Sequence, residues 1–303
     1  MIPFFVDLLR AQPTAVSTFI EPFAGGASVS LHLAAAGLVE RVVLGERDDL
    51  LYSFWKVAAD HTQWLIDAVQ TVPVTLEQWD AYKASPGTMQ KDKALAALFL
   101  NRTSFSGILF KKAGPIGGRT QKGDYKIDCR FPRDTICKRI RAVGDLADQG
   151  RLAAVRRGSY SSTIAWAHEE YGQDGSLAYL DPPFWAKADE LYRHSFTHVD
   201  HLELATYLQS ANFTWLLSYD AHPEVIDLYK TTFIPLPPPV RAARSAEAPA
   251  EGQATACSPA STPKHHFIDF RYNAHSTARG TEELVLTNLP VAPAGYLRGT
   301  LKS

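Results

Sequence analysis

"STFIEPFAGGASVSLHLAAAGLVERVVLGE", residues 17–46, is the stretch that decides the fold. Its apolar run at 17–23 has the length of a buried strand, and 40–46 predicts a second strand. Between them, residues 27–37 predict a helix that ends at Gly37. A strand, a glycine loop, a helix and another strand in this order are typical of doubly wound α/β proteins. The stretch therefore predicts an α/β sheet.

Apolar runs later in the chain extend this sheet. Strands are predicted at "LAAVRR" (152–157), "SLAYL" (176–180), "FTWLLSY" (213–219), "HHFIDFRY" and "EELVLTN", which makes seven strands in all. Residues 51–149 have mainly helical patterns, so we expect them to form a subdomain inserted into a main domain of residues 1–50 and 150–303. Residues 235–265 are rich in Pro, Ala and Ser and predict a flexible loop.

Composition excludes some classes of protein. The chain has 303 residues, a formal net charge of −1 and three cysteines without a C-x-x-C pair, which favours a reducing, cytoplasmic setting. No apolar run is long enough to span a bilayer. Charge is uneven along the chain, because the stretch from Arg102 to Arg141 contains eleven Lys or Arg residues but three Asp residues. Such a stretch is either a solvated surface or a contact for a polyanion such as a nucleic acid.

The glycine loop "EPFAGGA" (21–27) predicts a nucleoside site. Glycines between a strand and a helix let a ligand approach the backbone, and an acidic residue about twenty positions later can bind ribose hydroxyls. Glu46 lies twenty residues after Gly26. The loop differs from the G-x-G-x-x-G of dinucleotide enzymes, which favours a nucleoside without a pyrophosphate. The alternative is a tight turn that binds no ligand.

The second motif is "SLAYLDPPFW" (176–185), in which a strand ends in a carboxylate, two prolines and an aromatic ring. Ligand sites of open α/β sheets lie at such carboxyl ends. Asp181 can accept a hydrogen bond from an amino group, while Pro182 and Pro183 hold their carbonyls rigidly. Phe184 can stack on a flat ring, so the motif suits an exocyclic amine on a planar heterocycle. Alone, it would be an ordinary proline turn.

"FIEPFAGGASVSL", "NRTSFSGI" and "LAYLDPPFWAKADELYRHSF", in this order, resemble the Dam-like class of adenine-specific DNA N6-methyltransferases. The resemblance extends from about residue 17 to 220 and implies a Rossmann-like methyltransferase fold that uses S-adenosylmethionine. It also implies that residues 51–149 form a helical subdomain that recognises the DNA target, and that the adenine is flipped out of double-stranded DNA.

Site residues follow from this resemblance. It implies that Glu46 binds the ribose of the cofactor. The rest of the cofactor would lie on the loop formed by Pro22, Phe23, Ala24, Gly25 and Gly26. The catalytic turn would be Asp181, Pro182, Pro183 and Phe184, with Asp181 and the Pro182 carbonyl accepting from N6. DNA contacts would come from Asn101, Arg102, Lys111, Lys112, Arg119 and Lys122.

Three departures from the family pattern affect the cofactor site. No lysine-containing glycine segment precedes the first strand, so either the start is truncated or cofactor binding is weaker. Ser159 stands where an acidic cofactor contact is expected, and Phe184 replaces the commoner tyrosine. A cytosine-N4 or RNA amino-methyltransferase is the alternative enzyme, although aspartate before the prolines favours adenine. The alternative from outside the enzymes is a relative of this family that binds DNA but has lost catalytic activity.

Three histidines lie close together after the second motif, and three tryptophans lie in the predicted helical segment. His194, His198 and His201 could suggest a metal, but Thr197 and Asp200 are better explained as a helix N-cap with its acidic partner, and we expect no metal. Trp55, Trp64 and Trp79 fit helix packing. The expected state is a monomer, with a restriction enzyme as a conceivable partner.

Overall fold

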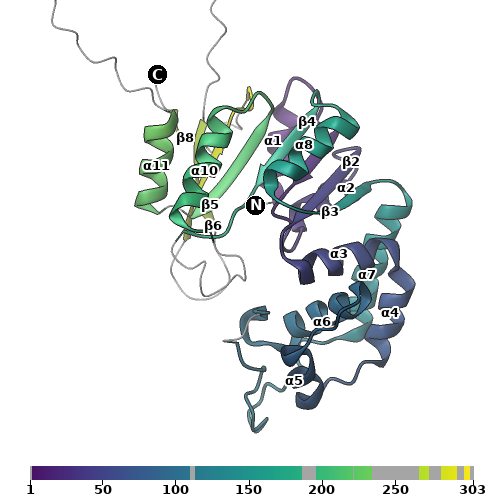
Figure 1. The fold of residues 1–303 in the computed structure, drawn as a ribbon. Helices are drawn as coiled ribbons and strands as arrows, with labels where there is room; N and C mark the ends of the chain where they lie inside the picture. Colours follow the sequence, from purple (N-terminus) through teal and green to yellow (C-terminus); the bar gives the residue numbers. More distant parts are fainter. Residues whose placement is uncertain are drawn as a thin grey trace, which may run out of the picture.

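The protein is described here from a computed structural model that covers residues 2–109, 113–185, 196–220, 222–233, 266–272, 281–291 and 297–300. Its described strands form one sheet in the order β3-β2-β1-β4-β5-β7-β6-β8 (Figure 1). They are β1 (Thr18–Glu21), β2 (Arg41–Glu46), β3 (Leu152–Arg157), β4 (Ser176–Leu180), β5 (Trp215–Asp220), β6 (His266–Tyr272), β7 (Thr281–Thr287) and β8 (Leu297–Thr300).

The direction of the strands divides the sheet into two parts. β1 to β5 pair in parallel, whereas β7 pairs antiparallel with β5 and with β6. The predicted strand segments overlap β1 to β7, with ends that differ by at most two residues. The predicted count of seven is wrong, because Leu297–Thr300 pairs antiparallel with β6 and adds an eighth strand. This segment is short and contains Gly299, so its sequence carries a weak strand signal.

Helices cover both faces of the sheet. Because successive side chains of a strand point to opposite faces, each face has its own hydrophobic core. On one face, Phe19 and Leu177 pack with residues of α1 (Ile2–Ala11) and α2 (Ser28–Ala35). On the other face, Ile20 and Leu180 pack against residues of three further helices, which are α8 (Tyr160–Tyr171), α10 (His198–Gln209) and α11 (Pro223–Phe233). The result is a three-layer α/β arrangement.

A helical segment joins β2 to β3 and extends from the β3 edge of the sheet (Figure 1). It comprises α3 (Asp49–Asp60), α4 (Thr62–Thr71), α5 (Leu76–Ala84), α6 (Gln90–Thr103), a short 3-10 helix (Phe105–Gly107) and α7 (Arg133–Asp148). α3 packs against α6, α7 and β3, which connects the segment to the sheet. Trp55 and Trp79 are buried within it, as their predicted packing role requires, and Trp64 packs against the same core.

The order of the strands determines where a site can form. β1 lies between β2 and β4, and the chain leaves it on one side toward β2 and returns on the other at β4. Open α/β sheets bind ligands at the carboxyl ends of strands beside such a reversal. Both sequence motifs follow strands at this point, because the glycine loop follows β1 and "DPPF" follows β4.

Candidate active site

One cavity of about 1570 Å³ opens at this edge of the sheet. The glycine loop, Glu46, Asp181 and Pro183 all line it, although the first and last of them are more than 150 positions apart in the chain. The same cavity reaches Asn101 and Arg102 at the end of α6 and Arg139 on α7. The structure therefore brings the two predicted motifs together in one place.

The glycine loop is held by contacts to its neighbours. Gly25 has a φ of 45° and Ala27 a φ of 47°, left-handed values at which the chain turns into α2. The Ala24 amide donates to the Gly45 carbonyl over 2.9 Å, and the indole Nε1 of Trp55 donates to the Gly25 carbonyl over 2.9 Å. Trp55 thus fixes the loop in addition to packing, a contact that its sequence position did not indicate.

Glu46 lies directly beside this loop. Its Oε2 accepts from the Gly25 amide at 3.1 Å, and its Oε1 accepts from the Asp48 amide at 3.0 Å. Burial raises the pKa of the Glu46 carboxyl, and these amides oppose the increase. Each carboxylate oxygen has a second lone pair, so both can still accept from a ligand hydroxyl.

Asp48 is a second carboxylate in this corner, and the sequence analysis missed it. Its Oδ1 caps α3 by accepting from the amides of Leu50 and Leu51. The residue is only 7% exposed and lines the cavity, and its Oδ2 has no hydrogen-bond partner among the described residues. Buried polar atoms are nearly always bonded, so an unbonded carboxylate oxygen here indicates a missing donor.

Asp181 lines the same cavity as Glu46. Its Oδ1 accepts a hydrogen bond of 2.8 Å from Ser218 on β5. Solvent reaches the carboxylate from the cavity, but protein encloses it on its other sides, and this desolvation raises its pKa to about 6. The Ser218 bond opposes that increase. Asp181 is therefore mainly ionised at neutral pH.

The remaining residues of the turn differ in their surroundings. Pro182 is buried, Pro183 lines the cavity, and the Phe184 ring is 38% exposed and does not line the cavity. Trp185 follows the turn, with its ring centre 4.6 Å from that of His201 and its Nε1 donating to Glu224.

Glu21, the last residue of β1, is the least expected charged group of the site. It is 4% exposed and lines the cavity, and its Oε2 accepts from the Ser30 amide at 3.2 Å. Burial raises its pKa to about 8, and the nearby Asp181 charge acts in the same direction. Glu21 is thus protonated at neutral pH while Asp181 is ionised. The sequence signal that could have identified Glu21 is a glutamate at the end of an apolar strand.

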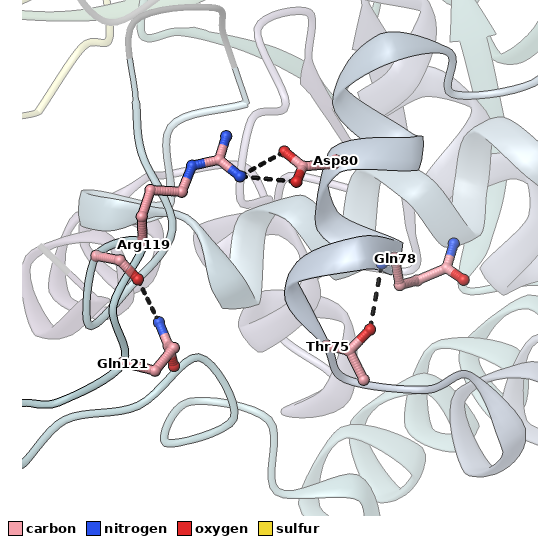
Figure 2. Close-up of polar contacts among 6 residues, drawn as sticks. Thr75, Gln78, Asp80, Arg119 and Gln121 are labelled. Carbon is pink, nitrogen blue, oxygen red and sulfur yellow. Dashed lines mark hydrogen bonds and ion pairs between the residues drawn. The ribbon is translucent and has the colours of Figure 1, made fainter.

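The predicted DNA contacts have different surroundings. Asn101 and Arg102 line the cavity, and the Nε of Arg102 donates to the Arg130 carbonyl over 2.7 Å. Arg119 forms an exposed ion pair of 2.7 Å with Asp80 (Figure 2). Its guanidinium carbon also lies 5.1 Å from the centre of the Trp79 ring. Lys122 is exposed. Lys111 and Lys112, like the predicted loop at 235–265, lie outside the described residues.

The histidine segment is a helix start. Thr197 and Asp200 form a capping box at the beginning of α10, which confirms that prediction. His201 is buried, and its Nδ1 hydrogen-bonds with the Tyr219 hydroxyl. His194 lies outside the described part of the chain, within which no cluster of three or more His, Cys, Asp or Glu is suited to a metal. No described helix has the length and apolarity needed to cross a membrane.

A mixed, mostly parallel sheet with a glycine loop and a D-P-P-aromatic turn at its reversal fits the fold of a methyltransferase. Residues 1–130 match the family model described as D12 class N6 adenine-specific DNA methyltransferase, and this match indicates DNA adenine-N6 methyltransferase activity. The matched residues include the glycine loop, Glu46 and the "NRTSFSGI" segment, whereas the D-P-P-F turn lies beyond them. A search of curated proteins found no match. The predicted resemblance to adenine-N6 methyltransferases is confirmed.

Proposed function

We propose that the protein transfers a methyl group from S-adenosylmethionine to N6 of an adenine flipped out of double-stranded DNA. The observation that carries the proposal is an ionisable acceptor, Asp181, on the same cavity as the glycine loop. The match to an adenine-N6 family supports adenine as the target base.

The residues of the cavity fit S-adenosylmethionine. This cofactor carries an amino group, a sulfonium and ribose hydroxyls, and when bound it supplies an electrophilic methyl group. Glu46 and the unbonded Oδ2 of Asp48 offer acceptors for hydroxyl or ammonium donors. Gly26 lines the cavity, and a Cβ built there would meet nothing within 4 Å, so the loop leaves room beside its backbone. Pro22, Phe23, Ala24 and Gly25 would complete this wall.

Asp181 and the Pro182 carbonyl would act on the adenine amine. The N6 lone pair is delocalised into the ring, which makes N6 a poor nucleophile. Two acceptors at its hydrogens favour a tetrahedral nitrogen and stabilise the positive charge that grows there. Only the ionised carboxylate can do this without competing as a donor, and a pKa of about 6 keeps Asp181 ionised at pH 7 to 8. Pro183 would keep the turn rigid and Phe184 would stack on the base.

The helical segment of residues 51–149 would recognise DNA. Asn101 and Arg102 line the cavity, and Arg139, which the sequence analysis did not single out, joins them. Arg119 and Lys122, together with Lys111 and Lys112, would contact phosphates further along the duplex. A phosphate bound by Arg119 would replace the exposed Asp80 carboxylate as its partner. Phosphate contacts of this kind position the duplex without reading its sequence.

The test is methyl transfer to plasmid DNA, with N6-methyladenine and N4-methylcytosine separated by mass spectrometry of the nucleosides. Wild-type protein should form N6-methyladenine alone. Asp181→Asn, which keeps the size of the side chain but removes the charge, should lower the rate at least about 100-fold because one charged acceptor at the reacting atom is lost. It should still bind S-adenosylmethionine in calorimetry. Undiminished methylation by this variant would refute the catalytic assignment.

A further inference from the structure

Two buried hydroxyls lie behind the Asp181 carboxylate. The Ser218 Oγ donates to Asp181 Oδ1 over 2.8 Å, and the Tyr179 hydroxyl lies 2.9 Å from the same Oγ. Ser218 is 1% exposed and Tyr179 is 2% exposed. Since a serine has only one hydroxyl proton and Asp181 accepts it, the bond between the two hydroxyls must have Tyr179 as its donor. The three groups therefore form a directed chain from Tyr179 through Ser218 to Asp181.

The register of the sheet produces this chain. β4 and β5 are parallel neighbours with Leu180 opposite Leu217, so the next pair along the strands is Asp181 and Ser218. Alternation puts Tyr179 and Asp181 on the same face of the sheet. The Tyr179 ring is held edge-on by Phe5 of α1 at 4.6 Å. Core packing thus fixes the first donor, and the strand register fixes the second.

We propose that Ser218 and Tyr179 are positioning residues that hold the Asp181 carboxylate ionised and oriented, with Oδ2 directed to the amine of the target base. The proposal rests on the catalytic role proposed for Asp181. A carboxylate that protein atoms partly desolvate gains from a hydrogen bond in its charged state, so a donor fixed by packing favours ionisation and costs no reorganisation during the reaction.

The charged groups around Asp181 do not replace this donor. Glu21 on β1 is a neighbouring acid, and its charge would oppose ionisation of Asp181. Five of the eight other charged residues on the described cavity wall are acidic: Glu46, Asp48, Asp145, Asp200 and Glu203, against Arg47, Arg102 and Arg139. Ser218 is the group that lowers the pKa of Asp181, against the effect of burial.

The direct test is to measure the pKa of Asp181 by carbon-13 NMR of the carboxyl group in the full-length protein. Ser218→Ala should raise this pKa by about one pH unit, which corresponds to the loss of one hydrogen bond to a charged group. Ser218→Thr keeps the hydroxyl and should restore the wild-type value, and Tyr179→Phe should give a smaller increase. Thr287→Val is the control, because it removes another buried hydroxyl of the sheet, bonded to the Trp215 carbonyl, away from Asp181.

The methylation rate should follow the same order. For Ser218→Ala, the acid limb of the kcat profile should move to higher pH, with roughly a fivefold loss at pH 6 that shrinks toward pH 8. Calorimetry with S-adenosylmethionine should give an unchanged Kd, which shows that the site is folded. An Asp181 pKa that Ser218→Ala leaves unchanged would overturn the proposal even if Asp181→Asn is inactive. Activity retained by Asp181→Asn would instead refute the catalytic role of Asp181 on which the proposal rests.

Discussion

At the scale of single residues, the site depends on two neighbouring carboxyl groups with different surroundings. Glu21 is almost fully buried, and its pKa is raised to about 8. Asp181 borders the cavity and has a donor in Ser218, and its pKa is raised to about 6. Two charges at this reversal of the sheet would repel each other, so the protonated state of Glu21 helps Asp181 to remain ionised.

The buried Glu21 should make stability depend on pH. Since its folded pKa lies above the usual glutamate value of 4.5, the folded state holds a proton that the unfolded state releases, and stability is lost as pH rises toward about 8. The slope can reach about 1.4 kcal/mol per pH unit. Urea denaturation between pH 6 and 8 should show this decline in the wild type and a nearly flat curve for Glu21→Gln.

Glu40→Gln is the matched control for this experiment, because Glu40 is exposed and pairs only with Arg41 among the described contacts. It should keep the wild-type decline. An equal decline in Glu21→Gln would assign the pH dependence to other groups. Asp181 contributes mainly below pH 6, so it does not obscure the comparison.

The sequence predicted the role of a single residue only where that residue type is uncommon at its position relative to a strand or helix. Glycines after a strand and "DPP" after another are such cases, and the structure brings them together at one cavity. Ser218 and Tyr179 are ordinary residues of apolar strands, and only the register between β4 and β5 gives them their contacts. Arg139 lies on an amphipathic helix among other basic residues, so its place on the cavity depends on how α7 packs.

At the scale of elements, the strands that flank the loop were predictable from apolar runs and glycines. Helix α1 was not predicted, because "IPFFVDLLRA" is short and contains charges, yet Phe4, Phe5 and Leu8 are fully buried by packing on the sheet. Local sequence defines which segments are strands, whereas distant packing decides which short segments join the core.

The close approach of β2 to the glycine loop should make Gly45 sensitive to substitution. A Cβ there would lie 2.7 Å from the Thr163 side chain on α8 and 2.9 Å from the Pro22 Cα. Gly45→Ala should therefore lower stability by about 1–3 kcal/mol through overpacking and shift the loop. We expect at least a roughly tenfold weaker Kd for S-adenosylmethionine in calorimetry, or about 1.4 kcal/mol.

A second substitution separates the two clashes. Adding Thr163→Ala removes the contact with α8 but leaves the contact with the Pro22 backbone, so stability should recover partly while cofactor binding stays weak. Gly123→Ala is the control, since a Cβ there meets nothing within 4 Å. A Kd for Gly45→Ala equal to that of the wild type would show that the loop does not need this close approach.

At the scale of the whole molecule, the net charge of −1 hides an uneven distribution. The basic stretch from Arg102 to Arg141 lies mostly in the helical segment, and some of its charges have structural partners. Arg119 pairs with Asp80, Arg133 donates to the carbonyls of Val69 and Val72, and Arg141 donates to Gln63. Charge counting from the sequence could not separate these residues from Arg102 and Arg139, which line the cavity.

This difference gives a test of where DNA binds. Neutralising a residue that contacts a phosphate lowers the slope of log K against log salt by about 0.9, whatever the DNA sequence. Arg139→Gln should therefore weaken binding to a generic duplex and reduce the slope by about one, as measured by fluorescence anisotropy over a series of KCl concentrations. Arg141→Gln, on the same helix but bonded to Gln63 and not on the cavity, should change the slope little. The opposite result, a loss with Arg141→Gln and none with Arg139→Gln, would place the duplex on the other side of α7 and separate it from the cavity that holds Asp181.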